Sequence, residues 1–163
     1  MVWDPTTGSI VDRLHGAFPL AWQGYRLAWC QDDDCKAVHI TDFSSSDEMV
    51  VVCPVGTFGF DAYEGAFSPD GKTLALALRL DFGADSRRAL AMIDVEEGTM
   101  DVVDGTNVEQ GHVFVDWSPS GESVFITGGA RFGPRQLVEY RVDDGTARTI
   151  PVEVGDFYGM AAF

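Results

Sequence analysis

Three cysteines are the residues with the most specific chemistry in this sequence, and two of them lie close together in the chain. Cys30 and Cys35 flank the acidic segment Gln31-Asp32-Asp33-Asp34, and Cys53 follows further along. If the flanking segments are strands of one hairpin, the sulfur atoms face each other at its neck, where opposed Cα atoms are about 4.5–5.5 Å apart. That separation suits a disulfide bond, so we predict one between Cys30 and Cys35, with Cys53 left as a free thiol.

Two other interpretations of the cysteines remain open, namely buried free thiols and a metal site with three thiolates. Pairing of the next two strands would bring Cys53 beside residues 36 to 38, so all three sulfur atoms should lie near one corner. No histidine clearly completes a metal site, since His39 lies further along its strand, and we expect no metal. A disulfide indicates an oxidising compartment. This predicts an extracytoplasmic or cell-surface location as part of a longer chain, with a cytoplasmic location as the alternative.

Two loops rich in charged residues are interpreted as solvated connections. Asp32-Asp33-Asp34 is a dense acidic loop tip. A calcium site would need about six or more oxygen ligands at rigid spacing, and the pattern Asp-x-Asp-x-Asp-Gly is absent. The second loop carries the charged residues Asp81, Asp85, Arg87 and Arg88.

The sequence lacks the patterns of nucleophilic and phosphate-binding sites. The run Ser44-Ser45-Ser46 has no Gly-x-Ser-x-Gly elbow, and the chain has 3 histidines. The glycine-rich segment 128–133 follows a predicted strand and precedes Pro134, with no helix to complete a phosphate cradle. We therefore expect no catalytic residue, no cofactor and no cofactor-binding residue.

Composition excludes several classes of partner. The 26 acidic and 11 basic residues give a formal net charge of −15, which disfavours nucleic acid and anionic membranes. Hydrophobic residues make up 45% of the chain, as in an ordinary folded domain. No apolar run is long enough to cross a membrane, and the opening residues 1–5 do not read as a signal peptide.

A repeated turn motif predicts the architecture that must position these residues. The segment Phe67-Ser68-Pro69-Asp70-Gly71 recurs about fifty residues later as Trp117-Ser118-Pro119-Ser120-Gly121, each time followed by an apolar run. Repeats with this period, built only of short strands, are typical of β-propeller blades. The sequence therefore predicts an all-β protein, a β-propeller of four-stranded antiparallel blades with about three blades plus partial terminal blade strands.

The blade boundaries follow from the turn motifs. Within the clearest blade, strands are expected over 61–67, 72–80, 88–95 and 99–104. The run Leu74 to Leu80 could be helical by propensity, but its place after a Pro-Asp-Gly turn favours a strand. The expected units are 1–14 (end of a preceding blade), 15–56, 57–106 and 107–154 (one blade each), and 155–163 (first strand of a further or closing blade).

These turn motifs and the Leu-Ala-type strands after them resemble the WD-like repeats of TolB-type β-propellers. The segment from Leu27 to Asp42, with its two cysteines, also resembles actinobacterial propeller proteins of unassigned role. In those proteins the repeat domain is carried on a longer, often surface-anchored chain. Trp3-Asp4 is the sole Trp-Asp pair in the chain, so the intracellular scaffold branch of the WD-repeat superfamily is less favoured.

The leading functional hypothesis is a non-catalytic interaction module that binds a protein or carbohydrate partner. The alternative is an accessory or catalytic propeller domain of a hydrolase or lyase. Convergence of polar side chains on one concave pocket would favour the enzyme, and dispersal would favour the module; the side chains to compare are Asp42, Asp61, Glu64, Asp81, Asp85, Asp116 and Arg131. Because a segment of about three blades leaves apolar faces and strand edges open, we expect a homo-oligomer or part of a longer chain. The aromatic residues Trp22, Phe67 and Trp117 occupy equivalent blade positions and are expected to pack between blades.

Overall fold

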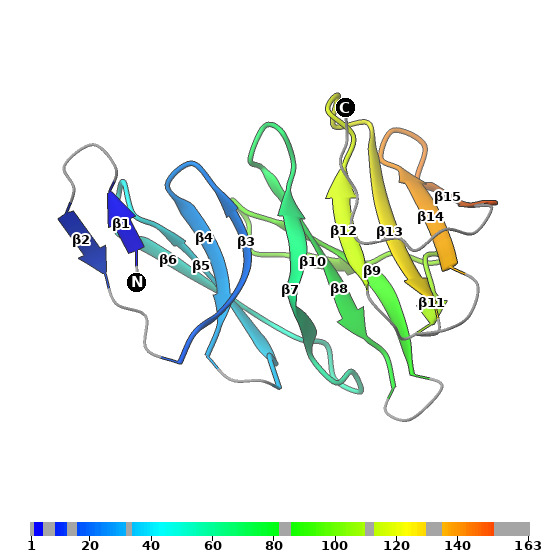
Figure 1. Cartoon of the computed structure of the whole chain (residues 1–163), viewed down its shortest axis with the longest axis horizontal. Coiled ribbons are helices and arrows are strands. Elements are labelled where there is room, and N and C mark those ends of the chain that lie inside the picture. The colour runs from blue at the N-terminus through cyan, green and yellow to red at the C-terminus, as the bar shows by residue number, and fades with distance from the viewer. Residues whose placement is uncertain are drawn as a thin grey trace.

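The computed structural model of the 163-residue chain describes residues 2–4, 9–12, 16–31, 34–81, 86–109, 113–129 and 135–151. Every regular element in these ranges is a β-strand. The strands form three successive antiparallel sheets that stand side by side in an open row (Figure 1). The all-β class and the four-stranded blades predicted from the sequence are thereby confirmed.

Each sheet is one blade, in which the strands pair in chain order. Blade 1 contains β3 (Phe18–Gln23), β4 (Arg26–Cys30), β5 (Ala37–Asp42) and β6 (Asp47–Val52). Blade 2 contains β7 (Phe60–Phe67), β8 (Thr73–Arg79), β9 (Arg87–Asp94) and β10 (Met100–Val102), and the two-residue strand β11 (Val108–Glu109) also pairs with β9. Blade 3 contains β12 (Phe114–Trp117), β13 (Ser123–Gly129), β14 (Arg135–Arg141) and β15 (Thr146–Ile150).

A two-stranded hairpin precedes blade 1. Its strands are β1 (Val2–Asp4) and β2 (Ser9–Asp12), which pair antiparallel with a register shift near Val2. The assignment of residues 1–14 to the end of a preceding blade stays a prediction. The strand expected within 155–163 lies outside the described residues.

The Ser-Pro-x-Gly turns set the register of blades 2 and 3. The Ser68 N–H donates to the Thr73 carbonyl across the turn, and the Ser118 N–H donates in the same way to the Ser123 carbonyl, both at 2.8 Å. Gly71 has a φ of +72°, a backbone conformation that glycine adopts without steric cost. The turn therefore fixes where β7 ends and β8 begins, and it places Phe67 opposite Leu74.

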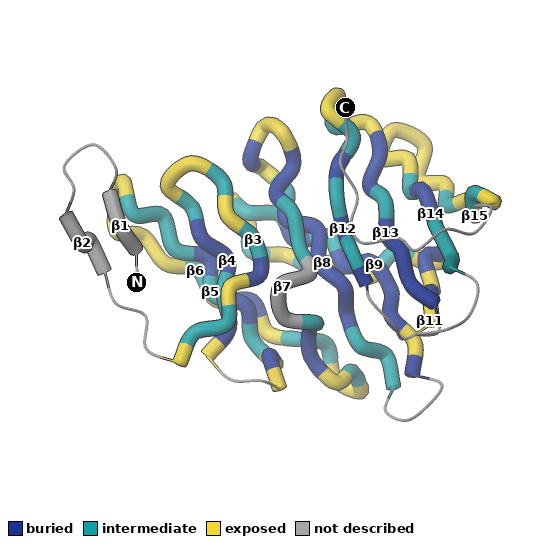
Figure 2. The backbone as a smooth tube through the Cα atoms, viewed as in Figure 1, coloured by how far each residue is buried: buried dark blue, intermediate teal, exposed yellow. Residues whose placement is uncertain are grey.

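The core lies between neighbouring blades, and the five central residues of β8 are all buried (Figure 2). Successive side chains of a strand point to opposite faces of its sheet. Leu74, Leu76 and Leu78 therefore pack toward blade 1, whereas Ala75 and Ala77 pack toward blade 3. Burial on both faces explains why the run of leucines and alanines forms a strand despite its helical propensity.

The outer strands are shorter or more exposed than expected from the sequence. The fourth strand of blade 2 spans Met100–Val102 instead of 99–104, because the chain turns at residues 104–105 to enter β11. The first strand of blade 3 begins at Phe114. The described part of the chain contains no apolar helix of membrane-spanning length.

Candidate functional site

The cysteine corner closes the loop between β4 and β5. Cys30 and Cys35 are joined in a disulfide with a Cα–Cα distance of 5.2 Å, which is the pairing that the sequence predicted. The geometry differs from a pair directly opposed across the hairpin, because the last described pair of β4 and β5 is Trp29 with His39. Cys35 lies outside the ladder with a φ of +49°. This left-handed turn, which is uncommon for a residue other than glycine, brings its sulfur back to Cys30.

Cys53 lies at the same corner, as the strand pairing predicted. Its N–H donates to the Lys36 carbonyl at 2.8 Å, and its sulfur lies 3.8 Å from the Cys35 carbonyl oxygen. Cys53 is a free thiol whose pKa is raised by burial, so it carries little thiolate at neutral pH. Within the described residues, no group of three or more histidine, cysteine or acidic side chains is placed to hold a metal ion.

This corner also joins blade 1 to blade 2. The Phe60 N–H donates to the Cys35 carbonyl at 3.0 Å, and the Arg79 guanidinium donates to the Asp34 carbonyl. Gly59 fits between these segments because it has no side chain. A Cβ there would lie 1.9 Å from the Asp34 carbonyl oxygen. The disulfide loop therefore packs closely against the start of β7.

A group of charged side chains lies at the same end of blade 2. Arg88 is buried and its guanidinium donates to the Asp61 carboxylate and to the Ser86 hydroxyl, the latter at 2.7 Å. Arg79 lies on the other side of Asp61, with 3.9 Å between Nε and Oδ1. Two guanidinium groups thus neutralise the Asp61 carboxylate. These ion pairs join β7, β8 and β9, which carry Asp61, Arg79 and Arg88 respectively.

The neighbouring loop carries a second ion pair. The Arg87 N–H donates to Asp81 Oδ1 at 2.5 Å, and Arg87 Nε donates to Oδ2 at 3.0 Å. These two hydrogen bonds, the backbone one first, hold the pKa of the Asp81 carboxyl below its ordinary value. Asp85 lies outside the described residues. In the described part of this loop, Asp81 and Arg87 form a partly exposed ion pair.

The acidic residues proposed for a catalytic pocket do not converge. Asp61 and Asp81 lie at the end of blade 2 where β7 begins, whereas Asp42 lies at the opposite end of blade 1, beside the turns. Hydrogen bonds from the Ser44 hydroxyl and N–H, at 2.5 and 2.8 Å, lower the pKa of Asp42. Asp116 accepts from the Trp117 N–H at 2.8 Å. The side chain of Glu64, like Arg131, lies outside the described part of the chain.

The turn ends of the blades present two hollows at equivalent positions. One, of about 320 Å³, lies between blades 1 and 2 and is lined by charged residues that include Arg26, Asp42, Asp47 and Glu48. The other, of about 220 Å³, lies between blades 2 and 3, beside Pro69, Trp117 and Gly121. Tyr25, which is 62% exposed, lies in the turn between β3 and β4, next to Arg26 in the chain. Sequence reasoning missed these hollows because they form only when neighbouring blades pack.

Hydrogen bonds from the turns lock neighbouring blades together. Gln23 Nε2 donates to the Ser68 carbonyl at 2.9 Å, and Arg26 Nη1 donates to the Gly71 carbonyl at 2.8 Å. Between blades 2 and 3, Trp117 Nε1 donates to the Ala66 carbonyl at 3.0 Å. The turns therefore fix both the register within a blade and the packing between blades.

Phe67 and Trp117 pack between blades as expected, but Trp22 does not. Phe67 is 8% exposed and Trp117 is 5% exposed, whereas Trp22 is 53% exposed. Its indole ring stacks instead on Phe43 of its own blade, with 6.1 Å between ring centroids. The expectation of an inter-blade position is thus wrong for Trp22 within this chain.

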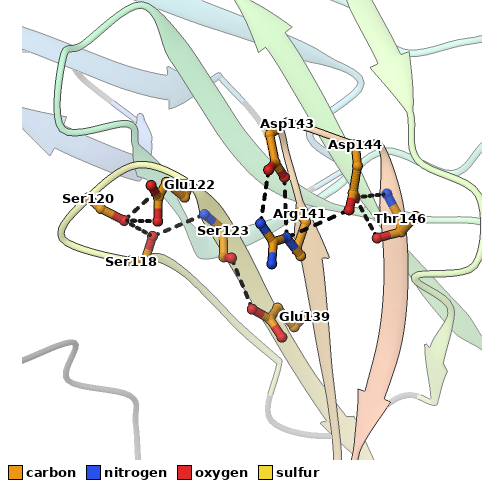
Figure 3. A network of polar contacts seen from close by, with 9 residues as sticks. All are labelled: Ser118, Ser120, Glu122, Ser123, Glu139, Arg141, Asp143, Asp144 and Thr146. Atoms are coloured by element: carbon orange, nitrogen blue, oxygen red, sulfur yellow. Dashed lines mark hydrogen bonds and ion pairs between the residues drawn. The ribbon is translucent and has the colours of Figure 1, made fainter.

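Blade 3 contains the most extended polar network (Figure 3). Its turn carries Ser118, which accepts from the Ser123 N–H at 3.0 Å, and the Ser123 hydroxyl donates to Glu139 at 3.0 Å. Arg141 forms a two-point ion pair with Asp143 on the next turn. The hydrogen bond from Arg148, followed by that from Ser123, lowers the pKa of Glu139. These contacts stay within one blade and leave no shared catalytic geometry.

Comparison with known proteins supports the same architecture. No protein-family model matches the chain, and no curated protein matches it. TolB from Acinetobacter baumannii matches 80% of this chain with 19% sequence identity and a TM-score of 0.55. A putative TolB from Agrobacterium tumefaciens matches 83% of it with 18% identity and a TM-score of 0.56. The fold is that of a TolB-type, WD40-like β-propeller.

A third match is the β-propeller domain of the trilobed protease from Pyrococcus furiosus, over 83% of this chain with 14% identity and a TM-score of 0.56. The chain spans less than half of the three matched proteins, 31%, 46% and 43% of their respective lengths. At these identities the comparisons establish the fold, which confirms the resemblance read from the turn motifs.

Proposed function

We propose that this chain is a non-catalytic propeller module that binds a basic protein partner at the turn end of blades 1 and 2. The observation that carries the proposal is the dispersal of the candidate acids. Asp61 and Asp81 are held by arginines at one end, and Asp42 is held by a turn at the other. Each of these three described acids has a structural partner.

The turn-end hollow supplies the binding surface. The charged residues Arg26, Asp42 and Asp47 line it, and the exposed residue Tyr25 precedes Arg26 in the chain. Tyrosine and arginine are enriched at protein interfaces, where an aromatic anchor is surrounded by a polar rim. The net charge of −15 favours a cationic partner by long-range attraction. Together these features favour a protein over a neutral carbohydrate.

The disulfide supports an extracytoplasmic setting for this module. A bond between Cys30 and Cys35 persists in oxidising compartments and is rare in the reducing cytosol. The matched fold includes a protease propeller, so an accessory role beside a catalytic domain remains the second candidate. In either case the propeller contributes binding, and the chemistry belongs elsewhere.

Surface plasmon resonance on the immobilised chain tests the proposal. The probes are a lysine-rich peptide, an arginine-rich peptide, polyglutamate and a set of neutral oligosaccharides. We expect saturable binding of the cationic peptides that weakens with salt, and a loss of at least about fivefold in affinity in Asp47→Asn and Tyr25→Ala. Asp101→Asn, on an exposed strand of blade 2, removes the same charge elsewhere and serves as the matched control.

Three results would contradict the proposal. Equal weakening by Asp47→Asn and Asp101→Asn would mean that binding reflects net charge without a site. Saturable binding of an oligosaccharide, with none of the cationic peptides, would favour the carbohydrate partner. Turnover of peptide or glycoside substrates by the isolated chain would favour the enzyme alternative.

A further inference from the structure

The face of blade 1 that points away from blade 2 carries exposed apolar side chains. Register places Trp22 opposite Leu27, His39 opposite both Trp29 and Val50, and Ala37 opposite Val52. Opposed residues share a face, so all of these side chains lie together. Trp22, Val50 and Val52 are 53%, 50% and 68% exposed. We call this surface the Trp22 face.

The equivalent faces of the other two blades are buried inter-blade contacts. In blade 2 the face with Phe67, Leu74 and Leu76 packs against blade 1. In blade 3 the face with Trp117, Val124 and Ile126 packs against blade 2. The Trp22 face is therefore equivalent in position to two faces that are buried between blades. Its exposed apolar side chains suit packing against another blade.

Two features of the Trp22 face suit it to an assembly interface. Trp29 stacks on His39 with 4.3 Å between ring centroids, and its indole N–H donates to Thr41 at 3.0 Å. His39 Nδ1 is in turn 2.8 Å from Glu48 Oε1. The corresponding positions in blade 2 are filled by apolar residues such as Leu76 and Ala91. The polar groups at the centre of the Trp22 face are thus hydrogen-bonded within the chain. They keep these partners both when the face is exposed and when another blade covers it.

We propose that a second copy of this chain covers the Trp22 face, so that two chains close one propeller ring. The far face of blade 3 in each copy would meet the Trp22 face of the other, in two identical contacts related by a twofold axis along the ring. The size of a ring supports this occupant. This chain spans 43% of the isolated propeller domain of the trilobed protease, so two copies approach one such ring.

Light scattering coupled to gel filtration tests the assembly. At tens of micromolar, the wild-type chain should have twice the 17.7 kDa mass of one chain. Trp22→Arg and Val52→Arg each place a charge on the interface and should halve that mass. Tyr25→Arg adds the same charge at an exposed turn and should leave it unchanged. Circular dichroism and thermal melts verify that each variant keeps its β-structure.

A mixing experiment distinguishes the ring from a dimer that pairs two Trp22 faces. Ile150→Arg alters the far face of blade 3, because Ile150 pairs with Leu137 on the side opposite Val138. Alone, this variant should also be monomeric. Mixed with Trp22→Arg, it should restore a dimer, since one of the two contacts then contains no substitution.

The proposal fails on any of three outcomes. A monomeric wild-type chain would mean that the Trp22 face awaits a different partner, such as a blade of another polypeptide. A Trp22→Arg variant that remains dimeric would place the contact elsewhere. An Ile150→Arg variant that remains dimeric on its own would show that the contact joins two copies of the Trp22 face.

Discussion

The indole nitrogen of Trp117 lies 3.0 Å from the carbonyl oxygen of Ala66, and this hydrogen bond crosses from blade 3 to blade 2. The ring is buried among apolar side chains of both blades. A single residue therefore supplies apolar area and a polar contact to the same interface. Because blades contact only their neighbours, much of the stability of a blade row resides in contacts of this kind.

Substitutions at Trp117 separate its two contributions. Trp117→Phe removes the N–H but retains most of the ring, and it should lower the free energy of unfolding by about 1–2 kcal/mol. Trp117→Ala also leaves a cavity and should cost about 3–5 kcal/mol. Trp22→Phe is the matched control at the exposed equivalent position, with an expected change below about 0.5 kcal/mol. Urea titration followed by circular dichroism gives these values; equal losses for Trp22→Phe and Trp117→Phe would refute the assignment of Trp117 to an interface.

The disulfide predicts a pattern of alkylation and a change in stability on reduction. Protein made under oxidising conditions should react with iodoacetamide at Cys53 alone after unfolding, and at all three cysteines after reduction. Reduction should lower the free energy of unfolding by about 2 kcal/mol, because the closed loop is short and gains little entropy in the unfolded chain. Mass spectrometry that finds three alkylated cysteines without prior reduction would contradict the bond between Cys30 and Cys35.

Gly59 should tolerate substitution much less than Gly56. Both have positive φ values, +101° and +93°, so alanine is strained at either position. At Gly56 a Cβ meets nothing within 4 Å, whereas at Gly59 it would lie 1.9 Å from the Asp34 carbonyl oxygen. Gly56→Ala should cost about 1–2 kcal/mol from backbone strain. Gly59→Ala must also displace the cysteine corner, so we expect a loss in the free energy of unfolding that is roughly twice as large or more. Equal falls in melting temperature for the two variants would argue against close packing of the cysteine corner on Gly59.

The sequence predicted those features that are determined by local chemistry. The Ser-Pro-x-Gly turns fix φ at proline and glycine, and the motif therefore predicted a strand on either side of each turn. The uninterrupted apolar run from Leu74 to Leu78 predicted a strand that is buried on both faces. The disulfide partners were predictable because only a few residues separate Cys30 from Cys35.

Features that depend on neighbouring blades could not be read from the sequence. Trp22 lies near the end of the first strand of its blade as Phe67 and Trp117 do, although a shorter turn at Gly24 follows it. Its exposure follows from its position at one end of the row. The left-handed backbone of Cys35 arises from packing against Gly59 and Phe60, which are distant in the sequence. The pairing of Asp61 with Arg79 and Arg88 likewise needs three strands in register. Local sequence thus specifies the blade, and the contacts between blades decide which side chains are exposed.

The ion pair of Glu139 should make stability fall on the acid side. Its pKa is lowered from the ordinary value of 4.5, mainly by the hydrogen bond from Arg148 and then by that from Ser123. A carboxyl whose pKa is lower in the folded state stabilises the fold above its unfolded pKa, and this contribution is lost as the pH falls through the folded pKa. The contribution of Glu139 to the free energy of unfolding should therefore be constant above about pH 5 and decline below about pH 4.5.

The variants Glu139→Gln and Arg148→Ala test this assignment. Glu139→Gln removes the titrating group. The decline of the free energy of unfolding between about pH 5 and 3, the acid limb, should therefore be shallower in this variant, as measured by urea titration at each pH. Arg148→Ala removes the stronger partner and should reduce the same slope while Ser123 keeps part of it. Asp101→Asn, which removes an exposed carboxylate of blade 2 away from Glu139, is the control. An acid limb that is unchanged in Glu139→Gln would show that other carboxylates dominate acid unfolding.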